Sequence, residues 1–230
     1  MHSHYLQTEP RRAVAAALID SGCVSVCADE PFRLPSGWAS PVYMDGRQLV
    51  SFPAARKSVL AHATDLLRST GALQGLAGIA GGESSGIALA AWLADASDLP
   101  LQYVRKRAAG HRHVEGCVQP GGRILLVDDV MAIGQSKVQF CRALAAAGAR
   151  VTDILVVFAY DTFPMAAGLA SADVGLHVLS TWRDVLAVAR DRGDFTDAAL
   201  DTLEGFLNDP VGWSRTHGGW GPAIADGTHA

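Results

Sequence analysis

Two neighbouring carboxylates, Asp128 and Asp129, form the most informative chemical feature of the sequence. They follow an apolar run at 124–127 that is typical of a buried strand, and a short segment containing Gly134 separates them from a predicted helix. Successive strand side chains point to opposite sides, so both acids cannot pair with one internal partner. Turn amides and a helix N-terminus suit a phosphate, whereas carboxylates suit sugar hydroxyls or a metal-bound water. The alternative is that both acids only cap the turn.

A basic cluster at 105–113 is the second chemical feature. Four permanent cations (Arg105, Lys106, Arg107 and Arg112) lie within eight residues, and His111 is among them. Such charges repel one another, so we expect a mobile, solvated loop until an anion arrives. Its place after a strand favours a lid over phosphates, and the alternative is a solubilising surface loop. Neither a P-loop nor a GxGxxG fingerprint occurs in the sequence.

The elements that must position these residues alternate between helix and strand from residue 51 onward. Apolar runs predict strands at 76–80, 101–104, 123–127, 151–160 and 174–179. Helical patterns lie at 53–67, 84–94, 134–147, 182–192 and 196–207. Buried strands separated by helices indicate an α/β fold with a parallel sheet covered on both faces. Ligands of such sheets bind beyond the carboxyl ends of the strands, where the two acids stand.

The chain divides into three parts on this interpretation. Residues 1–50 hold a frayed start, an Ala-rich helix at 11–19 and a small antiparallel lobe built from 24–27 and 41–44. Residues 51–208 form the core. Residues 209–230, rich in Gly and Pro, form an irregular C-terminal tail.

Composition narrows the class of protein. The chain has 230 residues, 49% of them hydrophobic and 18% charged, with a net charge of −4. This suits one domain with a small lobe, and the acidic balance argues against a nucleic-acid partner. The longest apolar run, 87–94, is far below the roughly 18 residues that a membrane span needs. The four cysteines form no CxxC pair and there is no secretory signal, so we expect a cytoplasmic protein.

Several segments together resemble a known family. Residues 124–136 resemble the phosphoribosyl-pyrophosphate (PRPP) motif of the type I phosphoribosyltransferases. Five further segments narrow the resemblance to the orotate phosphoribosyltransferases: 36–45, 81–86, 103–106, 114–116 and 181–186. Asn208-Asp209-Pro210 with Trp213 resembles one bacterial branch of that family. The resemblance covers roughly residues 30–215 and implies a type I phosphoribosyltransferase-like sheet with an N-terminal hood lobe.

The resemblance implies a role for each matching residue. Asp128 and Asp129 would hold the ribose hydroxyls. The 5-phosphate would lie on the following loop, made of Val130, Met131, Ala132, Ile133, Gly134, Gln135 and Ser136. The pyrophosphate would lie against the turn of Gly81, Gly82, Glu83 and Ser84. Ser36 and Tyr43 of the hood would cover the orotate ring.

The implied reaction is displacement of pyrophosphate from PRPP by orotate, which gives orotidine 5-monophosphate in pyrimidine biosynthesis. Its catalytic residues would be Lys106, Arg105, His111 and Asp129. Mg²⁺ would enter with PRPP rather than on direct protein ligands. The resemblance further implies a homodimer whose basic lid loop is shared between subunits.

The sequence departs from the family pattern at four positions. Ala132 and Ile133 replace small or hydroxyl-bearing residues of the phosphate loop, and Ala109 and Pro35 stand where many members have lysine. Each lost charge-assisted hydrogen bond is worth about 1.5–3 kcal/mol. Two alternatives to an active enzyme therefore remain: an impaired relative that senses PRPP or a nucleotide, and a phosphoribosyltransferase for another base.

Overall fold

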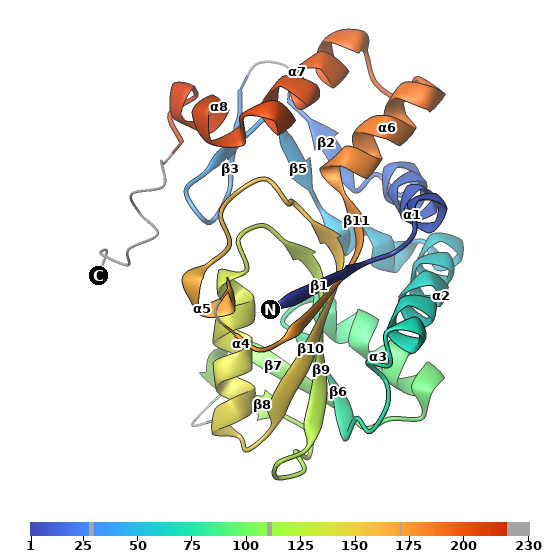
Figure 1. The fold of residues 1–230 in the computed structure, drawn as a ribbon, viewed down its shortest axis with the longest axis vertical. Helices are drawn as coiled ribbons and strands as arrows, with labels where there is room; N and C mark the ends of the chain where they lie inside the picture. Colours follow the sequence, from blue (N-terminus) through green and yellow to red (C-terminus); the bar gives the residue numbers. More distant parts are fainter. Residues whose placement is uncertain (28–29, 110–111, 171, 220–230) are drawn as a thin grey trace.

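A seven-stranded sheet forms the centre of the computed structural model, which describes residues 1–27, 30–109, 112–170 and 172–219 (Figure 1). Its strand order is β1-β11-β10-β9-β6-β7-β8, and all neighbours are parallel except β7 and β8. The strands are β1 (His2–Tyr5), β6 (Gly78–Gly82), β7 (Leu101–Ala109), β8 (Arg112–Glu115), β9 (Arg123–Met131), β10 (Arg150–Ala159) and β11 (Gly175–Thr181). The predicted parallel sheet is therefore confirmed.

Helices cover both faces of this sheet (Figure 1). They are α1 (Thr8–Asp20), α2 (Pro53–Ser69), α3 (Ser85–Ser97), α4 (Gln135–Ala146), α5 (Ala167–Ala170), α6 (Trp182–Arg192), α7 (Asp197–Asn208) and α8 (Pro210–Thr216). Alternate residues of β9 separate the two cores: Leu125 and Val127 face the larger core, whereas Ile124 and Leu126 face the smaller core with Phe140 of α4. Alternation along buried strands produces both layers.

The strand order reverses at β9, which fixes the place of the site. β9 pairs with β10 on one side and with β6 on the other. The connections that leave the carboxyl ends of β6 and β9 therefore run to opposite faces of the sheet, to α3 and to α4. Open α/β sheets bind ligands at such a reversal point.

The hood lobe consists of two short antiparallel pairs and a turn of 3-10 helix. β2 (Val24–Val26) pairs with β5 (Val42–Met44), as the sequence predicts, and β3 (Phe32–Arg33) pairs with β4 (Ala39–Ser40). The 3-10 turn η1 (Gly46–Ser51) then leads into α2. This turn brings the end of the hood back to the sheet, because η1 contacts β9 and α3.

Both chain ends differ from their predictions. The expected frayed start is wrong: β1 pairs in parallel with β11, and the rings of His4 and His177 stack at 5.0 Å. The expected irregular tail is wrong for its first part, which is helix α8. Asp209 caps this helix by accepting from the Gly212 amide at 2.9 Å, and Ser214 Oγ accepts from the Ala39 amide of the hood at 2.8 Å. Residues 220–230 of the predicted tail lie outside the described residues.

The basic segment after Val104 also differs from its prediction as a loop. β7 continues to Ala109, and β8 starts at Arg112 and runs back antiparallel to it. Residues 110–111, between the two strands, lie outside the described residues. The cations therefore lie along two paired strands, and Arg105 is offset by Glu115 at 3.0 Å.

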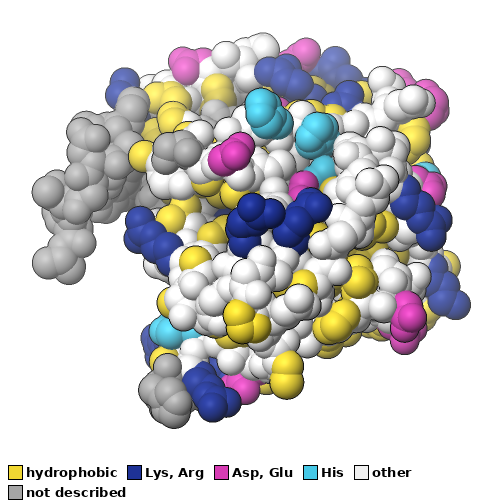
Figure 2. Space-filling view, turned by 60° about the horizontal axis from the view of Figure 1, so that its bottom comes forward, with side chains coloured by type: hydrophobic (Ala, Val, Ile, Leu, Met, Phe, Trp, Pro, Cys, Tyr) yellow, Lys and Arg dark blue, Asp and Glu magenta, His cyan; other side chains and the backbone are white. Residues whose placement is uncertain are grey.

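The surface mixes both signs of charge. Figure 2 shows acidic and basic side chains interspersed on one face, with a group of histidines among them and hydrophobic atoms scattered between. Among the described residues, the exposed large hydrophobic side chains are Tyr5, Phe52 and Leu101. Within the described ranges, every helix is too short or too polar to cross a lipid bilayer.

Candidate active site

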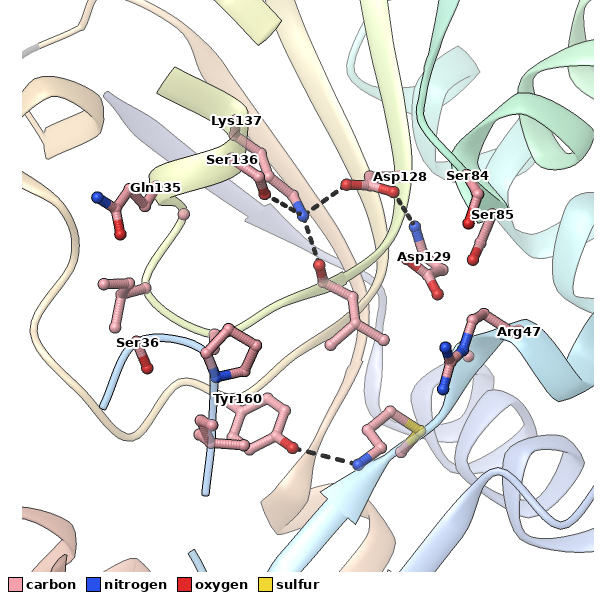
Figure 3. A pocket seen from close by; sticks show the side chains of 18 of the residues that line it. Ser36, Arg47, Ser84, Ser85, Asp128, Asp129, Gln135, Ser136, Lys137 and Tyr160 are labelled. Carbon is pink, nitrogen blue, oxygen red and sulfur yellow. Dashed lines mark hydrogen bonds and ion pairs between the residues drawn. The ribbon is translucent and has the colours of Figure 1, made fainter. Parts of the chain in front are cut away.

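A cavity of about 590 Å³ lies between the hood lobe and the carboxyl ends of the central strands (Figure 3). The hood supplies one wall, and the turn after β6 and the β9–α4 connection supply the others. Seven charged side chains line it: Asp45, Arg47, Glu83, Lys106, Asp128, Asp129 and Lys137. The cavity therefore stands at the sheet edge where the sequence predicts ligand binding.

The two adjacent acids have different surroundings, as their opposite directions require. Asp128 points toward α4, where its Oδ2 lies 2.6 Å from Lys137 Nζ, and its Oδ1 accepts from the Asp129 amide at 3.0 Å (Figure 3). Both side chains of this pair are buried. The resemblance implies that Asp128 holds a ribose hydroxyl, yet both of its oxygens already have partners within the fold.

Asp129 points away from this pair and toward the cavity (Figure 3). Among the described residues, no basic side chain lies within ion-pair distance of its carboxylate. Burial raises the pKa of Asp129 from its ordinary value of 3.8 to about 6, and the charge of Asp128 adds to the rise. A carboxylate in this state is ready to accept from hydroxyls or to stand beside a cation.

The predicted phosphate loop follows directly. Six of its seven predicted residues line the cavity: Val130, Ala132, Ile133, Gly134, Gln135 and Ser136. Gly134 adopts φ +85°, a left-handed conformation that favours glycine, and α4 begins at the next residue. The loop therefore presents the N-terminus of α4 to the cavity, a geometry that suits an anion. Met131 is the exception, because its side chain is buried in the smaller core.

The turn after β6 contributes Glu83 and Ser84 but not its glycines. A Cβ on Gly81 would lie 2.6 Å from the Gly86 carbonyl oxygen, and one on Gly82 would lie 2.5 Å from the Phe140 ring. Gly81 and Gly82 therefore allow β6, α3 and α4 to pack closely, rather than lining the cavity. The Glu83 carboxylate accepts from the Lys106 backbone amide at 2.6 Å, which fixes the turn against β7.

Of the predicted catalytic residues Arg105 and Lys106, only one lines the cavity. Lys106 is exposed and lines the cavity. Arg105 does not line it, since its guanidinium donates to Glu115 at 3.0 Å and to the Tyr103 hydroxyl at 3.3 Å. Adjacent strand residues face opposite sides, which explains the difference. His111 lies outside the described residues.

The hood residues expected over the base are both present. Ser36 and Tyr43 line the cavity, together with Leu34, Met44 and Tyr160. Ser36 Oγ is buried and has no hydrogen-bond partner within the described part of the chain.

Three further residues line the cavity that the predicted site does not include: Arg47, Lys137 and Tyr160. Arg47 forms a bidentate contact with Asp45, at 2.5 Å and 3.0 Å, and its hydrogen bonds hold the pKa of the Asp45 carboxyl below its ordinary value. Lys137 lies under the phosphate loop, and Tyr160 follows the end of β10. The position of Tyr160 beyond a strand end is a signal that could have found it, whereas the pairing of Lys137 is visible only in three dimensions.

Comparisons with known proteins agree with this arrangement. No protein-family model matches the sequence. The orotate phosphoribosyltransferase of Sinorhizobium fredii is 41% identical over 216 residues, covering 92% of this chain and 93% of that relative. The solved orotate phosphoribosyltransferase from Aeropyrum pernix is 29% identical with a TM-score of 0.63, over 78% of this chain and 99% of that one. Leishmania donovani UMP synthase is 27% identical with a TM-score of 0.77, over 87% of this chain and 43% of that one. The chain belongs to the orotate phosphoribosyltransferase family.

Proposed function

We propose that the protein transfers the phosphoribosyl group of PRPP to orotate and releases pyrophosphate. The observation that carries the proposal is the direction of Asp129, which faces the cavity beside a loop that presents a helix N-terminus. An acceptor for sugar hydroxyls and a binding surface for a phosphate thus stand side by side. The family relationship supplies the identity of the substrates.

The 5-phosphate subsite is the β9–α4 loop. Backbone amides at the start of α4 and the Ser136 hydroxyl supply hydrogen-bond donors, and the helix dipole adds to the attraction. Ala132 and Ile133 line the loop without hydroxyl donors, so the backbone carries more of the binding here.

The base subsite is the hood side of the cavity. Tyr43 and Leu34 offer apolar surface for a planar ring, and the unpartnered Ser36 hydroxyl offers a polar contact. Tyr160 supports this wall from below, because its hydroxyl accepts from the Met44 amide at 3.2 Å.

Catalysis depends on stabilising the departing pyrophosphate. The bond from C1 to the pyrophosphate oxygen breaks while the bond from C1 to the orotate ring nitrogen forms, and that nitrogen loses its proton to pyrophosphate or water. C1 becomes cation-like, so the barrier falls when the leaving charge is neutralised. Lys106 and Arg47 line the cavity and are the cations placed for this role.

Magnesium belongs to this proposal as a companion of PRPP. In the described ranges, no cluster of three or more His, Cys, Asp or Glu could hold a metal alone. Asp129, whose pKa is raised to about 6, is a single carboxylate that fits beside a cation already held by substrate oxygens. When bound, Mg²⁺ offsets pyrophosphate charge.

A homodimer and a cytoplasmic location complete the proposal. The β7–β8 hairpin carries exposed cations, Arg107 and Arg112, that do not line the cavity of their own chain. In a dimer they would reach the cavity of the second copy. Sedimentation at micromolar protein concentration tests the homodimer independently of catalysis.

The test of the function is direct. Protein, PRPP and Mg²⁺ are mixed with orotate, and the loss of orotate absorbance is followed. Turnover supports the proposal. PRPP binding by calorimetry without turnover of orotate would instead favour a sensor, and turnover of a different base would redirect the substrate.

A further inference from the structure

Lys137 is a charged residue in an unusual place. Its side chain is 3% exposed at the start of α4, directly beneath the phosphate loop. Burying an ammonium group is costly unless its charge and its donors are all matched. A buried lysine beside a ligand cavity therefore needs an explanation beyond packing.

All three donors of the ammonium group have acceptors. Lys137 Nζ lies 2.6 Å from Asp128 Oδ2, donates to the Val130 carbonyl at 2.5 Å and donates to Ser136 Oγ at 3.3 Å (Figure 3). A lysine ammonium has three N–H groups, so its capacity is fully used. The three partners bracket the loop, since Asp128 precedes it and Val130 and Ser136 are its first and last residues. Lys137 therefore holds the two ends of the loop together.

The contact with Ser136 sets the direction of a hydroxyl. Because Lys137 donates to Ser136 Oγ, the hydroxyl proton of Ser136 must point to another acceptor. Ser136 lines the cavity, so an anion there is the natural acceptor. An oriented donor matters more in this chain than in one with further hydroxyls, because Ala132 and Ile133 carry none.

The contact with Asp128 fixes the direction of one of the two acids that line the cavity. Asp128 is held between Lys137 and the glycine-lined start of α3, where a Cβ on Gly86 would lie 3.0 Å from Asp128 Oδ1. Lys137 offsets its charge there, whereas among the described residues no basic side chain lies within ion-pair distance of Asp129.

We propose that Lys137 is a positioning residue for the phosphoribosyl site: its buried ammonium closes the loop, aims the Ser136 hydroxyl at the 5-phosphate and fixes the direction of Asp128 at the edge of the cavity. The inference rests on the proposed function for the identity of the ligand. It assigns to Lys137 no contact with the reacting atoms.

Lys137→Met is the first variant, and Lys57→Met, on an exposed lysine of α2, is its matched control. We expect the KM for PRPP to rise at least 30-fold in Lys137→Met, with kcat changed less than fivefold, and no change in the control. An unchanged KM for PRPP in folded Lys137→Met protein overturns the inference.

A double variant separates positioning from stability. Lys137→Met leaves Asp128 buried without its partner, so the single variant is also expected to be less stable. Asp128→Asn with Lys137→Met removes both charges and is expected to recover thermal stability but not PRPP affinity. Recovery of affinity together with stability would show that Lys137 has only a structural role.

Ser136→Ala gives the sharpest readout. In the wild-type background it should weaken PRPP binding about tenfold, whereas in the Lys137→Met background it should have almost no further effect. Equal losses in both backgrounds contradict the orienting role.

Calorimetric titration with PRPP and with ribose 5-phosphate keeps this inference distinct from the proposed function. If wild-type protein binds PRPP but does not turn over orotate, the function fails while the affinities still test Lys137. If wild-type protein binds neither ligand, both are overturned.

Discussion

Gly46 of the hood lies against the Asp129 carboxylate: a Cβ on Gly46 would come within 2.8 Å of Asp129 Oδ2 and 2.9 Å of Asp129 Cβ. The first turn of η1 thus touches the acid that faces the cavity. The absence of a side chain at Gly46 allows this contact. The hood and the core therefore meet directly beside Asp129 in the wall of the cavity.

Gly46→Ala should therefore displace the Asp129 side chain. Overpacking of this kind costs about 1–3 kcal/mol, and we expect the Kd for PRPP to rise roughly tenfold. Isothermal titration measures the change. Gly205→Ala is the control, since no atom lies within 4 Å of a Cβ there; it should leave PRPP affinity unchanged and stabilise α7 by roughly 0.5–1 kcal/mol. Equal affinity of both variants would contradict a steric role for Gly46.

Asp129→Asn should stabilise the free protein while weakening PRPP binding. The folded-state pKa of about 6 lies above the ordinary 3.8, so the fold holds the Asp129 proton more tightly than the unfolded chain does. The stability from this group is thus complete below about pH 4 and is lost as the pH rises through 6. At pH 8 we expect Asp129→Asn to gain about 1–3 kcal/mol in the free energy of unfolding by urea.

The same group predicts the pH dependence of activity. Wild-type kcat/KM for PRPP should fall below about pH 6, because protonation removes the carboxylate to which the proposed function assigns the ribose hydroxyls. Initial rates between pH 5 and pH 8 test this. A variant without the carboxylate should show low kcat/KM throughout and no inflection near that pH, and retention of the inflection would assign it to another group.

Lys106→Ala should lower kcat by about 100-fold, which is typical for the loss of one group that stabilises developing negative charge. Its effect on stability should be small because the side chain is exposed and the Glu83 contact uses the backbone amide. Single-turnover kinetics and thermal unfolding measure the two quantities. Lys57→Ala, an exposed lysine of α2, is the control for loss of charge.

Arg47→Ala should raise the KM for PRPP by about tenfold, because one exposed cation at the cavity is lost. For the same reason, catalysis by the variant should depend less on salt concentration than catalysis by the wild type. Arg68→Ala is the control, because it removes the same charge from an exposed residue at the end of α2 that does not line the cavity. If both variants respond equally, the effect of Arg47 is one of net charge alone.

Tyr160→Phe should loosen the hood. The variant leaves the buried Met44 amide without its acceptor, which costs about 1–3 kcal/mol. We expect the KM for orotate to rise more than that for PRPP, because Met44 is next to Tyr43 in the hood strand β5. Tyr5→Phe, on a partly exposed tyrosine of β1, is the control. Equal changes in both KM values would argue against a hood-specific effect.

Most of the core could be predicted from the sequence because its strands are continuous apolar runs. The run at 154–158 lies within β10, and the pair Asp128 and Asp129 diverges as strand alternation requires. The same rule, applied to Arg105 and Lys106, would have predicted that only one of them faces the cavity. Strand alternation therefore indicates different directions for these two side chains, whereas the resemblance to the family implied a catalytic role for both.

Other features depend on contacts between distant segments and carry no local pattern. β1 is polar and short, and it is a strand only because β11 offers a parallel edge. Helix α8 is intermediate: Asp209 at its N-cap and Pro210 after it are a local start signal, whereas the hydrogen bond from the Ala39 amide to Ser214 is visible only in the fold. Lys137 resembles any surface lysine in sequence, and only the fold places Asp128 opposite it.

The Lys137–Asp128 pair also bears on how this site can change over evolutionary time. Loss of either charge alone leaves the other buried without a partner, which destabilises the protein. Evolutionary intermediates with only one of the two substitutions are therefore disfavoured. The two positions should therefore covary among relatives, with lysine opposite an acid or neutral residues at both. Asp129 has no such ion-pair partner among the described residues, so its identity depends on the ligand rather than on Lys137. It should therefore stay acidic in every lineage that still binds the same sugar phosphate.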